Sequence, residues 1–516
     1  MFRSTAATGS MTLVSRIFGF ARDMVIAGQF GASLYADAFF VAFRIPNLFR
    51  RLFAEGSFSQ GFVPVLAEYK TQRGHDEVRM LVDRVAGTLA SVLFLVTVVC
   101  MLAAPLFVAV FAPGFLNQPE KYAVTAVMLR ITFPYLLFIS LAAFAGAILN
   151  TYNRFSIPAF TPVFLNVSLI LAALLLSPHF ARPVVALAWG VSIGGLLQLA
   201  FQLPFLKQLG LLPRPVVAWH DPGVRRILKL MGPAVFGASV AQINLMFDTL
   251  LASFLQTGSV SWLYYADRLL EFPLGVFGIA LATVILPSLS EQHADGDTAQ
   301  FSQLLDWALR WVCVITIPAA LGLMLFAAPM LSTLFQYGRM SEHDVLMSSY
   351  ALTAYAPGLI AFTLVKVLAP AYYSRHDTRT PVRIGLIAMF SNMAMNLIII
   401  YPLSRLGVGH VGLALATCLS GFLNASMLYR GLHRAGVYRP TAGWARLARQ
   451  LLIANAIMAV VLLVGRGELD RWSAWSPWLR AANLGGWIAA ATAIYVMVLW
   501  RLGWRLRDMT STRPPV

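Results

Sequence analysis

Charged residues are scarce in this sequence. Asp, Glu, Lys and Arg make up only 12% of its 516 residues, whereas 59% are hydrophobic and the mean hydropathy is +0.71. Stretches of about 20 apolar residues, long enough to cross a bilayer as a helix, recur along the whole chain. The composition therefore predicts an all-α polytopic membrane protein and excludes a sizeable water-soluble domain.

Cysteines are also rare. Only Cys100, Cys313 and Cys418 are present, and each lies inside an apolar run. No disulfide framework is expected, and each cysteine should serve as a small hydrophobic side chain. The N-terminal region has one early basic residue, Arg3, and no small-residue cleavage site before the first apolar stretch, which favours a retained helix over a signal peptide.

Signatures of enzymatic chemistry are missing as well. The eight histidines fall in loops or at the ends of apolar stretches, and the sequence contains neither HExxH nor a P-loop. Gly407-Val-Gly409-His-Val-Gly412 matches a dinucleotide fingerprint by letter, but it lies between apolar stretches and follows no strand. We therefore expect a transporter without catalytic residues, metal or other cofactor, rather than an enzyme.

The few charges that are present are mostly positive. Lys and Arg number 39 against 22 Asp and Glu, which gives a formal net charge of +17. No soluble basic module accompanies this excess, so nucleic acid is not an expected partner. Anionic membrane lipids and an anionic substrate fit the charge better.

The apolar stretches predict about 14 transmembrane helices. Basic loops tend to be cytoplasmic, and a cytoplasmic N-terminus places about 23 Lys and Arg inside and about seven outside, among them Lys121 and Arg480. Both termini should then be cytoplasmic. The predicted spans are 10–30, 35–53, 82–111, 123–149, 158–176, 184–205, 228–255, 262–286, 304–326, 345–373, 381–401, 411–432, 447–464 and 479–499.

An internal repeat relates the two halves of the chain. Tyr35-Ala36-Asp37 recurs as Tyr265-Ala266-Asp267, and the pair Pro64 and Glu68 recurs as Pro287 and Glu291. Farther on, Pro134 precedes Asn153 by the same 19 residues that separate Pro357 from His376. The common order of these matches predicts two related lobes of six helices each.

The repeat predicts the domain organisation. An N-terminal lobe over 1–206 and a second lobe over 227–433 are joined by a basic connector at 207–226, and 434–516 adds two helices and a basic tail. Because six is an even number, the repeat is parallel, about an axis along the membrane normal. A central cavity and alternating access are then expected between the lobes.

Several cations lie at membrane depth. Arg130, Arg310 and Lys366 are expected to snorkel to an interface. Lipid exposure of the other six would cost on the order of 15–20 kcal/mol in sum, so they should line a hydrated cavity. A guanidinium fork binds phosphate in a bidentate manner and stays charged, which indicates a phosphate-bearing substrate. These six are Arg16, Arg22, Arg44, Arg50, Arg51 and Arg268.

Some of these arginines have simpler explanations, which stay open at this point. Arg16 could anchor the first span near the cytoplasmic surface, and Arg50 and Arg51 could form a solvated helix end. Arg268 could pair with Asp267 or Glu271, just as Asp23 could pair with a neighbouring arginine.

Neutral and acidic groups complete the expected site. Asp37 shares a helix stripe with Arg44, Arg51 and Glu55. Asn47 follows Pro46, which loosens the helix, and Ser261, Asp267 and Glu271 accompany Arg268. A second group could coordinate a small cation such as Na⁺ or could only make helix-packing hydrogen bonds; it comprises Asp248, Asn392, Asn396 and Thr417.

Four long segments resemble the MurJ (MviN) family of lipid II flippases, in the MOP exporter superfamily. They are SRIFGFARD, DAFFVAFRIPNLFRRLFAEGSFSQGFVPVLAEYK, ILNTYNRFSIPAF and YYADRLLEFPLGV. The resemblance covers essentially the whole chain. It implies a 14-helix, MATE-like fold with a twelve-helix core, two extra helices that form a groove for a polyprenyl tail, and transport of undecaprenyl-pyrophosphate-linked disaccharide pentapeptide to the periplasmic leaflet for peptidoglycan synthesis.

The same resemblance implies roles for particular residues. The family's essential arginines fall on Arg16, Arg22, Arg50 and Arg268, and its further polar positions fall on Asp37, Asn47, Ser261 and Glu271. At Arg44 we expect charge rather than arginine to matter. Some relatives bind sodium through acidic residues of the seventh and eleventh helices; Asn392 and Asn396 are not acidic, which leaves coupling to Na⁺ or to the membrane potential open.

Location and partners follow from the same family. The chain should reside in the bacterial inner membrane, act as a monomer, and work alongside other cell-wall proteins. The alternative within the superfamily is an ion-coupled polysaccharide or drug exporter, although a drug exporter for cations should carry acidic cavity walls. A membrane transferase would need more loop acids, and a structural scaffold would tolerate changes of the buried charges.

Overall fold

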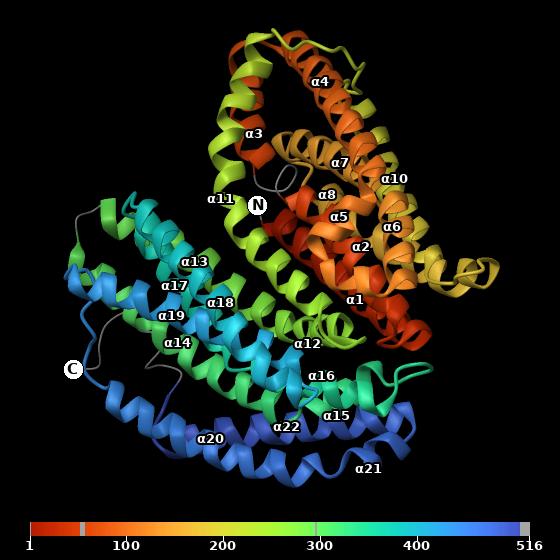
Figure 1. Ribbon diagram of the computed structural model, residues 1–516. Coiled ribbons are helices and arrows are strands. Elements are labelled where there is room, and N and C mark those ends of the chain that lie inside the picture. Colours follow the sequence, from red (N-terminus) through yellow and green to blue (C-terminus); the bar gives the residue numbers. More distant parts are fainter. Residues whose placement is uncertain (1, 52–56, 295–296, 506–516) are drawn as a thin grey trace. The chain divides into compact units, whose positions relative to one another are not determined.

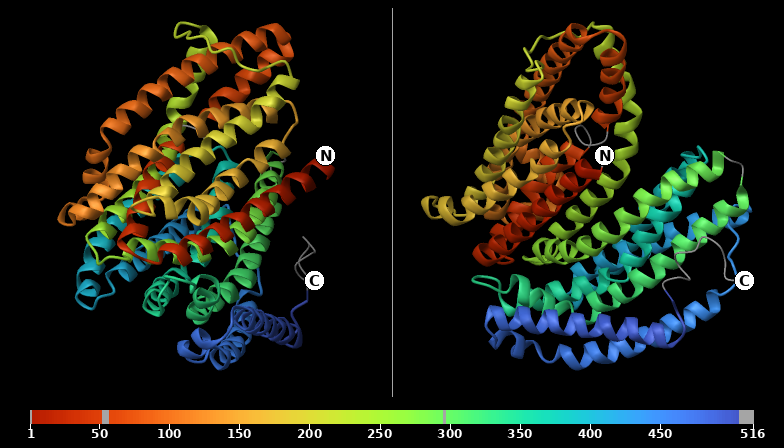
Figure 2. Two further views of the ribbon diagram at one scale, coloured as in Figure 1. Left: turned by 90° about the vertical axis from the view of Figure 1, so that its right-hand side faces the viewer. Right: turned by 180° about the vertical axis from the view of Figure 1, so that it is seen from behind.

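The computed structural model describes residues 2–51, 57–294 and 297–505. All regular elements in these ranges are helices, which confirms the all-α prediction. The chain divides into two compact units, each described by itself: unit 1 holds residues 1–261 and 337–340, and unit 2 holds 262–336 and 341–516. Figure 1 and Figure 2 show the helices of both.

Unit 1 contains the first eleven helices and the start of the twelfth. Its helices are α1 (Phe2–Phe30), α2 (Leu34–Arg50), α3 (Ser57–Gln72), α4 (His75–Leu102), α5 (Ala104–Phe111), α6 (Pro119–Thr132), α7 (Pro134–Thr151), α8 (Ser156–Phe160), α9 (Pro162–Leu171), α10 (Val185–Gln208) and α11 (Pro222–Ser253). Here α11 packs along α3, so the seventh predicted span lies with unit 1 although the repeat groups it with the second lobe.

Unit 2 contains the rest of α12 and ten further helices. They are α12 (Ser259–Pro273), α13 (Ile279–Ala294), α14 (Thr298–Leu325), α15 (Ala327–Phe335), α16 (Glu342–Tyr355), α17 (Gly358–Tyr373), α18 (Arg379–Arg405), α19 (Gly409–Arg434), α20 (Trp444–Arg466), α21 (Leu469–Ala474) and α22 (Pro477–Arg501). Figure 1 shows α20 and α22 side by side and antiparallel, with α21 at one end.

The helices are long and apolar enough for a membrane protein. Nine helical segments of the described ranges meet the length and hydropathy needed to cross a bilayer, and the bent pair α16 and α17, which meet at 41°, would make a tenth. Within the described ranges, each of the 14 predicted spans overlaps one or more helices, but the count of 14 is not confirmed. The chain is a multi-pass membrane protein.

The internal repeat is visible in the backbone. Pro64 lies inside α3 and Pro287 inside α13, at matching places after α2 and α12. Asn153 and His376 both have positive φ, of 60° and 59°, and they are the two non-glycine residues with positive φ in the described part of the chain. Each follows the end of a helix, where a left-handed residue ends the turn. The lobe boundaries and their parallel arrangement stay predictions.

Apolar side chains form the core of each unit. In unit 1, α3 and α7 pack through Phe58, Phe62 and Phe144, whose ring centroids lie 5.1–5.9 Å apart. In unit 2, one apolar cluster joins α20 and α22 to α14 and includes Leu451 and Tyr495. The Tyr495 hydroxyl donates to the Val314 carbonyl at 2.7 Å, so the buried phenol is satisfied.

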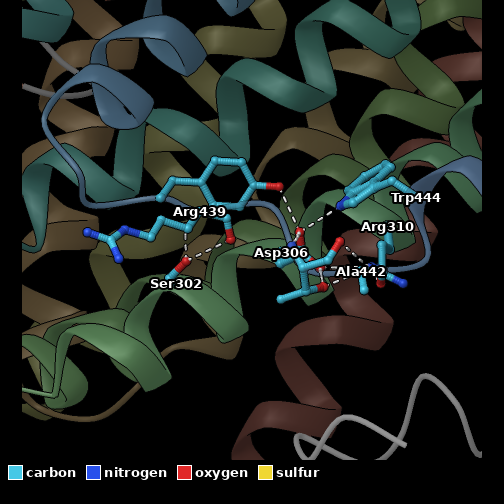
Figure 3. A network of polar contacts seen from close by, with 8 residues as sticks. Ser302, Asp306, Arg310, Arg439, Ala442 and Trp444 are labelled. Carbon is cyan, nitrogen blue, oxygen red and sulfur yellow. Dashed lines mark hydrogen bonds and ion pairs between the residues drawn. The ribbon is translucent and has the colours of Figure 1, made fainter.

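A polar cluster fixes the start of α20 to α14 (Figure 3). The buried Asp306 carboxylate accepts hydrogen bonds from Arg310 Nε at 2.8 Å, Tyr438 Oη at 2.7 Å and Trp444 Nε1 at 2.7 Å. Thr441 donates to it through both its amide and its hydroxyl. Burial and the hydrogen bond to Asp306 raise the pKa of Tyr438, which therefore stays a phenol that can donate.

This cluster changes the interpretation of Arg310, which we expected to snorkel. Its side chain is only 20% exposed, and besides Asp306 it donates to the Thr441 hydroxyl at 2.7 Å and the Ala442 carbonyl at 2.8 Å. The sequence gives no hint of this arrangement because most of the partners lie more than 130 residues away.

Candidate arginine site

Arg22 lies on α1 and is 8% exposed. Its Nη2 is 2.6 Å from Asp23 Oδ1, and its Nη1 donates to Asn166 Oδ1 of α9 at 3.1 Å. Asn166 in turn donates to the Ser15 carbonyl at 3.2 Å, which fixes the amide orientation. The predicted pairing of Asp23 with an arginine is confirmed, and the guanidinium is held in place and locally neutralised.

The stripe on α2 runs from buried to exposed. Asp37 is fully buried, Arg44 and Arg50 are half-buried, and Arg51 is exposed. Arg44 Nη1 donates to Thr249 Oγ1 of α11 at 3.0 Å, and Arg50 Nε donates to Asn47 Oδ1 at 2.9 Å. Glu55, the fourth member of the predicted stripe, lies outside the described residues.

Asp37 and Ser261 come together in a buried cluster of unit 1. Asp37 Oδ1 accepts from the Ser261 amide at 3.0 Å and hydroxyl at 2.7 Å, while Oδ2 accepts from Lys121 Nζ and the Gly258 amide, both at 2.8 Å. The carboxylate thus caps the first turn of α12, whose N–H groups need acceptors. Four donors occupy its two oxygens, which gives Asp37 a structural role whether or not substrate ever reaches it.

Sequence reasoning placed Lys121 in a loop, and the structure buries it. Its exposure is 1%, and its ammonium also lies 4.3 Å from the ring centre of Phe115. A buried aspartate in an apolar helix needs a cationic partner, so Asp37 was the feature of the sequence that could have predicted a buried lysine or arginine beside it. Thr249 and Asn166, which orient Arg44 and Arg22, carry no signal of their own in the sequence.

On α12, Arg268 pairs with an acid of its own helix. Its Nη1 is 3.2 Å from Glu271 Oε2, with the two side chains 25% and 50% exposed. Spacing of three residues places the two groups on one face, as the sequence indicated. Asp267 is half-buried beside them.

The arginines divide between the two units. Arg16 is half-buried and shares unit 1 with Arg22, Arg44, Arg50 and Arg51, whereas Arg268 belongs to unit 2. Their convergence on one cavity stays a prediction.

The candidate cation ligands divide in the same way. Asp248 belongs to unit 1, while the other three form a group in unit 2 in which both asparagines are buried: Asn392 donates to Thr417 Oγ1 at 3.3 Å and to Ser420 Oγ at 3.2 Å, and Asn396 donates to Asn392 Oδ1 at 2.7 Å. The two bonds from Asn392 join α18 to α19, and the bond from Asn396 lies within α18. They match the helix-packing explanation, and a role in cation binding stays untested.

Comparison with known proteins identifies the family. The family profile described as "Lipid II flippase MurJ" matches residues 26–481. The chain is 50% identical to the "Probable lipid II flippase MurJ" of Vibrio cholerae, over 99% of this chain and 98% of the relative. The chain belongs to the MurJ family.

Other members agree. The chain is 43% identical to the "Lipid II flippase MurJ" of Burkholderia cenocepacia, over 98% of both chains. Its fold matches the solved structure "Lipid II flippase MurJ, inward closed conformation" with a TM-score of 0.79, 25% identity, and coverage of 95% of this chain and 97% of that one. The MurJ assignment from the sequence motifs is confirmed.

A more distant solved structure shares the fold of this MurJ-family chain. An inward-facing multidrug resistance MATE transporter of the MOP superfamily matches with a TM-score of 0.67 at 14% identity, over 84% of this chain and 98% of that one. At that identity the likeness concerns the fold alone. The MATE-like fold class is confirmed.

Proposed function

We propose that this chain is a lipid II flippase that carries undecaprenyl-pyrophosphate-linked disaccharide pentapeptide from the cytoplasmic to the periplasmic leaflet of the bacterial inner membrane. The supporting observation is near full-length identity of 50% and 43% with proteins named as lipid II flippases. The chain transports its substrate and breaks no bond in it. Alternating access between two lobes is the mechanism that fits a MATE-like fold.

The arginines give a physical reason why this chain could carry a pyrophosphate headgroup across the membrane. A pyrophosphate headgroup with its sugars and peptide cannot cross hydrocarbon unaided, because its charges and polar groups would lose their hydration. Guanidinium groups replace that hydration with charge-assisted hydrogen bonds. Arg22 and Arg268 are held next to Asp23 and Glu271, whereas Arg44 donates to the neutral Thr249 and so keeps its full positive charge for an anion.

Roles within the site follow from these contacts. We assign phosphate binding to Arg16, Arg22, Arg44, Arg50 and Arg268, with Arg51 at the exposed end of α2 as an entry contact. Asn47 positions Arg50, and Glu271 positions Arg268. Asp37 and Ser261 support the site by holding α2 to the start of α12.

The test uses cells in which the native flippase is depleted and variants of this chain are expressed. Periplasmic exposure of lipid II should be lost with Arg22→Ala, Arg50→Ala or Arg268→Ala at normal membrane levels of the protein. Arg44→Lys should retain exposure and Arg44→Ala should lose it, because only charge is needed there.

Arg430→Ala is the matched control, since Arg430 is an exposed arginine near the end of α19 and is not one of the predicted site residues. Normal lipid II exposure with the three site variants would overturn the proposal. Loss with Arg430→Ala as well would show that the assay reports general charge loss and not the site.

The net positive charge within the membrane also motivates a proposal on energy coupling. We propose that the membrane potential resets the empty carrier, since moving one charge through the field is worth about 2.3 kcal/mol per 100 mV. Flipping in sealed vesicles should then depend on the potential, and Na⁺ alone should not replace it. Flipping that is indifferent to the potential would overturn this.

A further inference from the structure

One long part of unit 2 contains no acidic residue. Between Asp377 and Glu468 the sequence has nine arginines and neither Asp nor Glu. The next acid after Asp470 is Asp508, although four described arginines lie between them. Four exposed arginines of this part gather at the place where α20 begins and α22 ends: Arg446, Arg449, Arg501 and Arg505.

Two contacts bring the helix ends together. Gln450 Nε2 of α20 donates to the Leu502 carbonyl just after α22, at 2.9 Å. Arg446 lies over Gly503, where an ideal Cβ would be only 3.2 Å from its Nη2; this glycine also has a φ of +86°. The backbone at Gly503 thus leaves the room in which the Arg446 side chain crosses from α20 to α22.

Helix stability does not explain the two arginines of α20. Arg446 and Arg449 stand three residues apart in the first two turns of α20, where like charges repel and the helix dipole disfavours cations. The first turn of α20 contains no acidic residue to offset them. A bound anion would offset both the repulsion between the two arginines and their unfavourable interaction with the helix dipole.

On both α20 and α22, exposed apolar side chains lie about one helical turn from the arginines. Leu452 follows Arg449 by three residues and is 73% exposed, and Met497 precedes Arg501 by four and is 51% exposed. Trp500 is 54% exposed and lies under Arg505, whose guanidinium carbon is 4.8 Å from the ring centre. Tryptophan and arginine above exposed aliphatic side chains are typical of a membrane interface.

We propose that Arg446, Arg449 and Arg501 bind the headgroup of an anionic phospholipid whose acyl chains lie along Leu452 and Met497. The site is independent of the proposed arginine site for lipid II. The Asp306 cluster holds the start of α20 on α14, so the basic surface is presented by a fixed pair of helix ends. A role of these arginines in membrane orientation alone would require positive charge but no defined lipid contact.

The experiment uses the full-length chain in neutral detergent, titrated with phosphatidylglycerol, phosphatidylcholine or inorganic phosphate. Bound lipid is counted by native mass spectrometry. Phosphatidylglycerol should remain bound, while phosphatidylcholine and free phosphate should not, because the site needs both a negative headgroup and acyl chains.

A matched pair of variants tests the location. Arg446→Gln/Arg449→Gln/Arg501→Gln should weaken phosphatidylglycerol binding by about tenfold or more. The control variant Arg379→Gln/Arg383→Gln/Arg430→Gln removes the same charge from exposed positions of α18 and α19. It should change the affinity for phosphatidylglycerol less than about twofold. If the first triple variant is not recovered folded, Arg449→Gln is compared with Arg383→Gln.

Equal losses in the two triple variants would show diffuse charge attraction and overturn the site, as would no loss in either. Lipid II exposure is measured in cells with the same variants. Loss of phosphatidylglycerol selectivity at Arg449 without loss of flipping confirms that the two sites are separate, and failure of the binding prediction alone leaves the flippase proposal standing.

Discussion

Each unit contains a buried aspartate with several donors, and the two differ in how they are built. Asp37 in unit 1 is paired with Lys121, 84 residues away, and both side chains are at most 2% exposed. Asp306 in unit 2 is paired with Arg310, one turn away on α14, whose side chain is 20% exposed. The first pair depends wholly on tertiary contacts, whereas the second begins as a local helix pair and gains tertiary donors.

The difference concerns what happens when one partner is lost. If Asp37 is removed, the Lys121 ammonium loses its anionic partner and cannot be hydrated instead, because it is buried against Phe115. Without Asp306 the Arg310 guanidinium still has the Thr441 and Ala442 oxygens and a partial path to solvent. Removal of the aspartate should therefore destabilise the protein more in unit 1 than in unit 2, because the unit 1 pair is more deeply buried.

The largest effect is expected for Asp37→Ala. It leaves a buried ammonium unpaired and the first turn of α12 without its acceptor, which should lower the free energy of unfolding by about 3–5 kcal/mol. Thermal unfolding of the purified protein measures it. Asp37→Ala/Lys121→Met should recover a good part of the loss; a double variant no more stable than the single one would contradict the role of the ion pair.

Asp306→Ala should give the next largest loss of stability and lower the free energy of unfolding by about 2–3 kcal/mol. Arg310 retains other acceptors, while Tyr438 and Trp444 lose theirs. The same unfolding assay applies. Asp306→Asn, which keeps an acceptor oxygen, should lose less. A loss from Asp306→Ala that exceeds that from Asp37→Ala would break the comparison between the units.

A pair of like charge in unit 2 gives a pH-dependent contrast to these ion pairs. The hydrogen bond of Glu342 with Asp470 raises the pKa of Glu342 above its ordinary 4.5, with smaller contributions from burial and charge repulsion. The folded protein therefore binds the proton more tightly than the unfolded chain. This stabilisation is present below pH 4.5 and is lost as pH rises through the raised pKa.

Glu342→Gln should keep the hydrogen bond to Asp470 and remove the pH dependence from this pair. Unfolding temperatures measured from below pH 4.5 to neutrality should fall more steeply with rising pH for the natural chain than for the variant. Parallel curves for the two proteins would contradict the shared proton. Asp306 variants should leave this difference unchanged.

The smallest effect tests the repeat. Asn153 and His376 hold equivalent left-handed positions, but asparagine tolerates this conformation better than histidine. His376→Gly should stabilise the protein by about 0.5–1 kcal/mol and Asn153→Gly by less than about 0.5 kcal/mol. Thermal unfolding of both variants side by side checks the order; destabilisation by His376→Gly would show that its side chain matters more than its backbone.

Much of the fold could be predicted from the sequence. Apolar stretches located the helices because a bilayer demands about 20 such residues, and the Pro64 and Pro287 match located the repeat. The candidate arginines could be found because charge is rare in these helices. The partners of that charge could not: nothing in the sequence places Lys121 against Asp37 or Tyr438 against Asp306, since those contacts join residues 84 and 132 positions apart.

Arg480 shows the same limit. We counted it among the cations on the outer side of the membrane, yet it is 7% exposed and donates to the carbonyls of Ser332, Gln336 and Ser473, which lie near the ends of α15 and α21. Those carbonyls need donors because helix ends leave them unsatisfied. A positive-inside count treats every arginine near the end of a span alike and cannot identify one that satisfies a helix end.

The sequence by itself determined that the chain is helical, membrane-embedded and a member of its family, because hydropathy and local motifs are properties of neighbouring residues. Only the tertiary structure decided which arginines have an acidic partner and which have a neutral one, such as Arg22 beside Asp23 and Arg44 beside Thr249. The physical reason is that the energy of a buried charge depends on what lies within a few ångströms of it, and helix packing brings residues from distant parts of the chain to that distance.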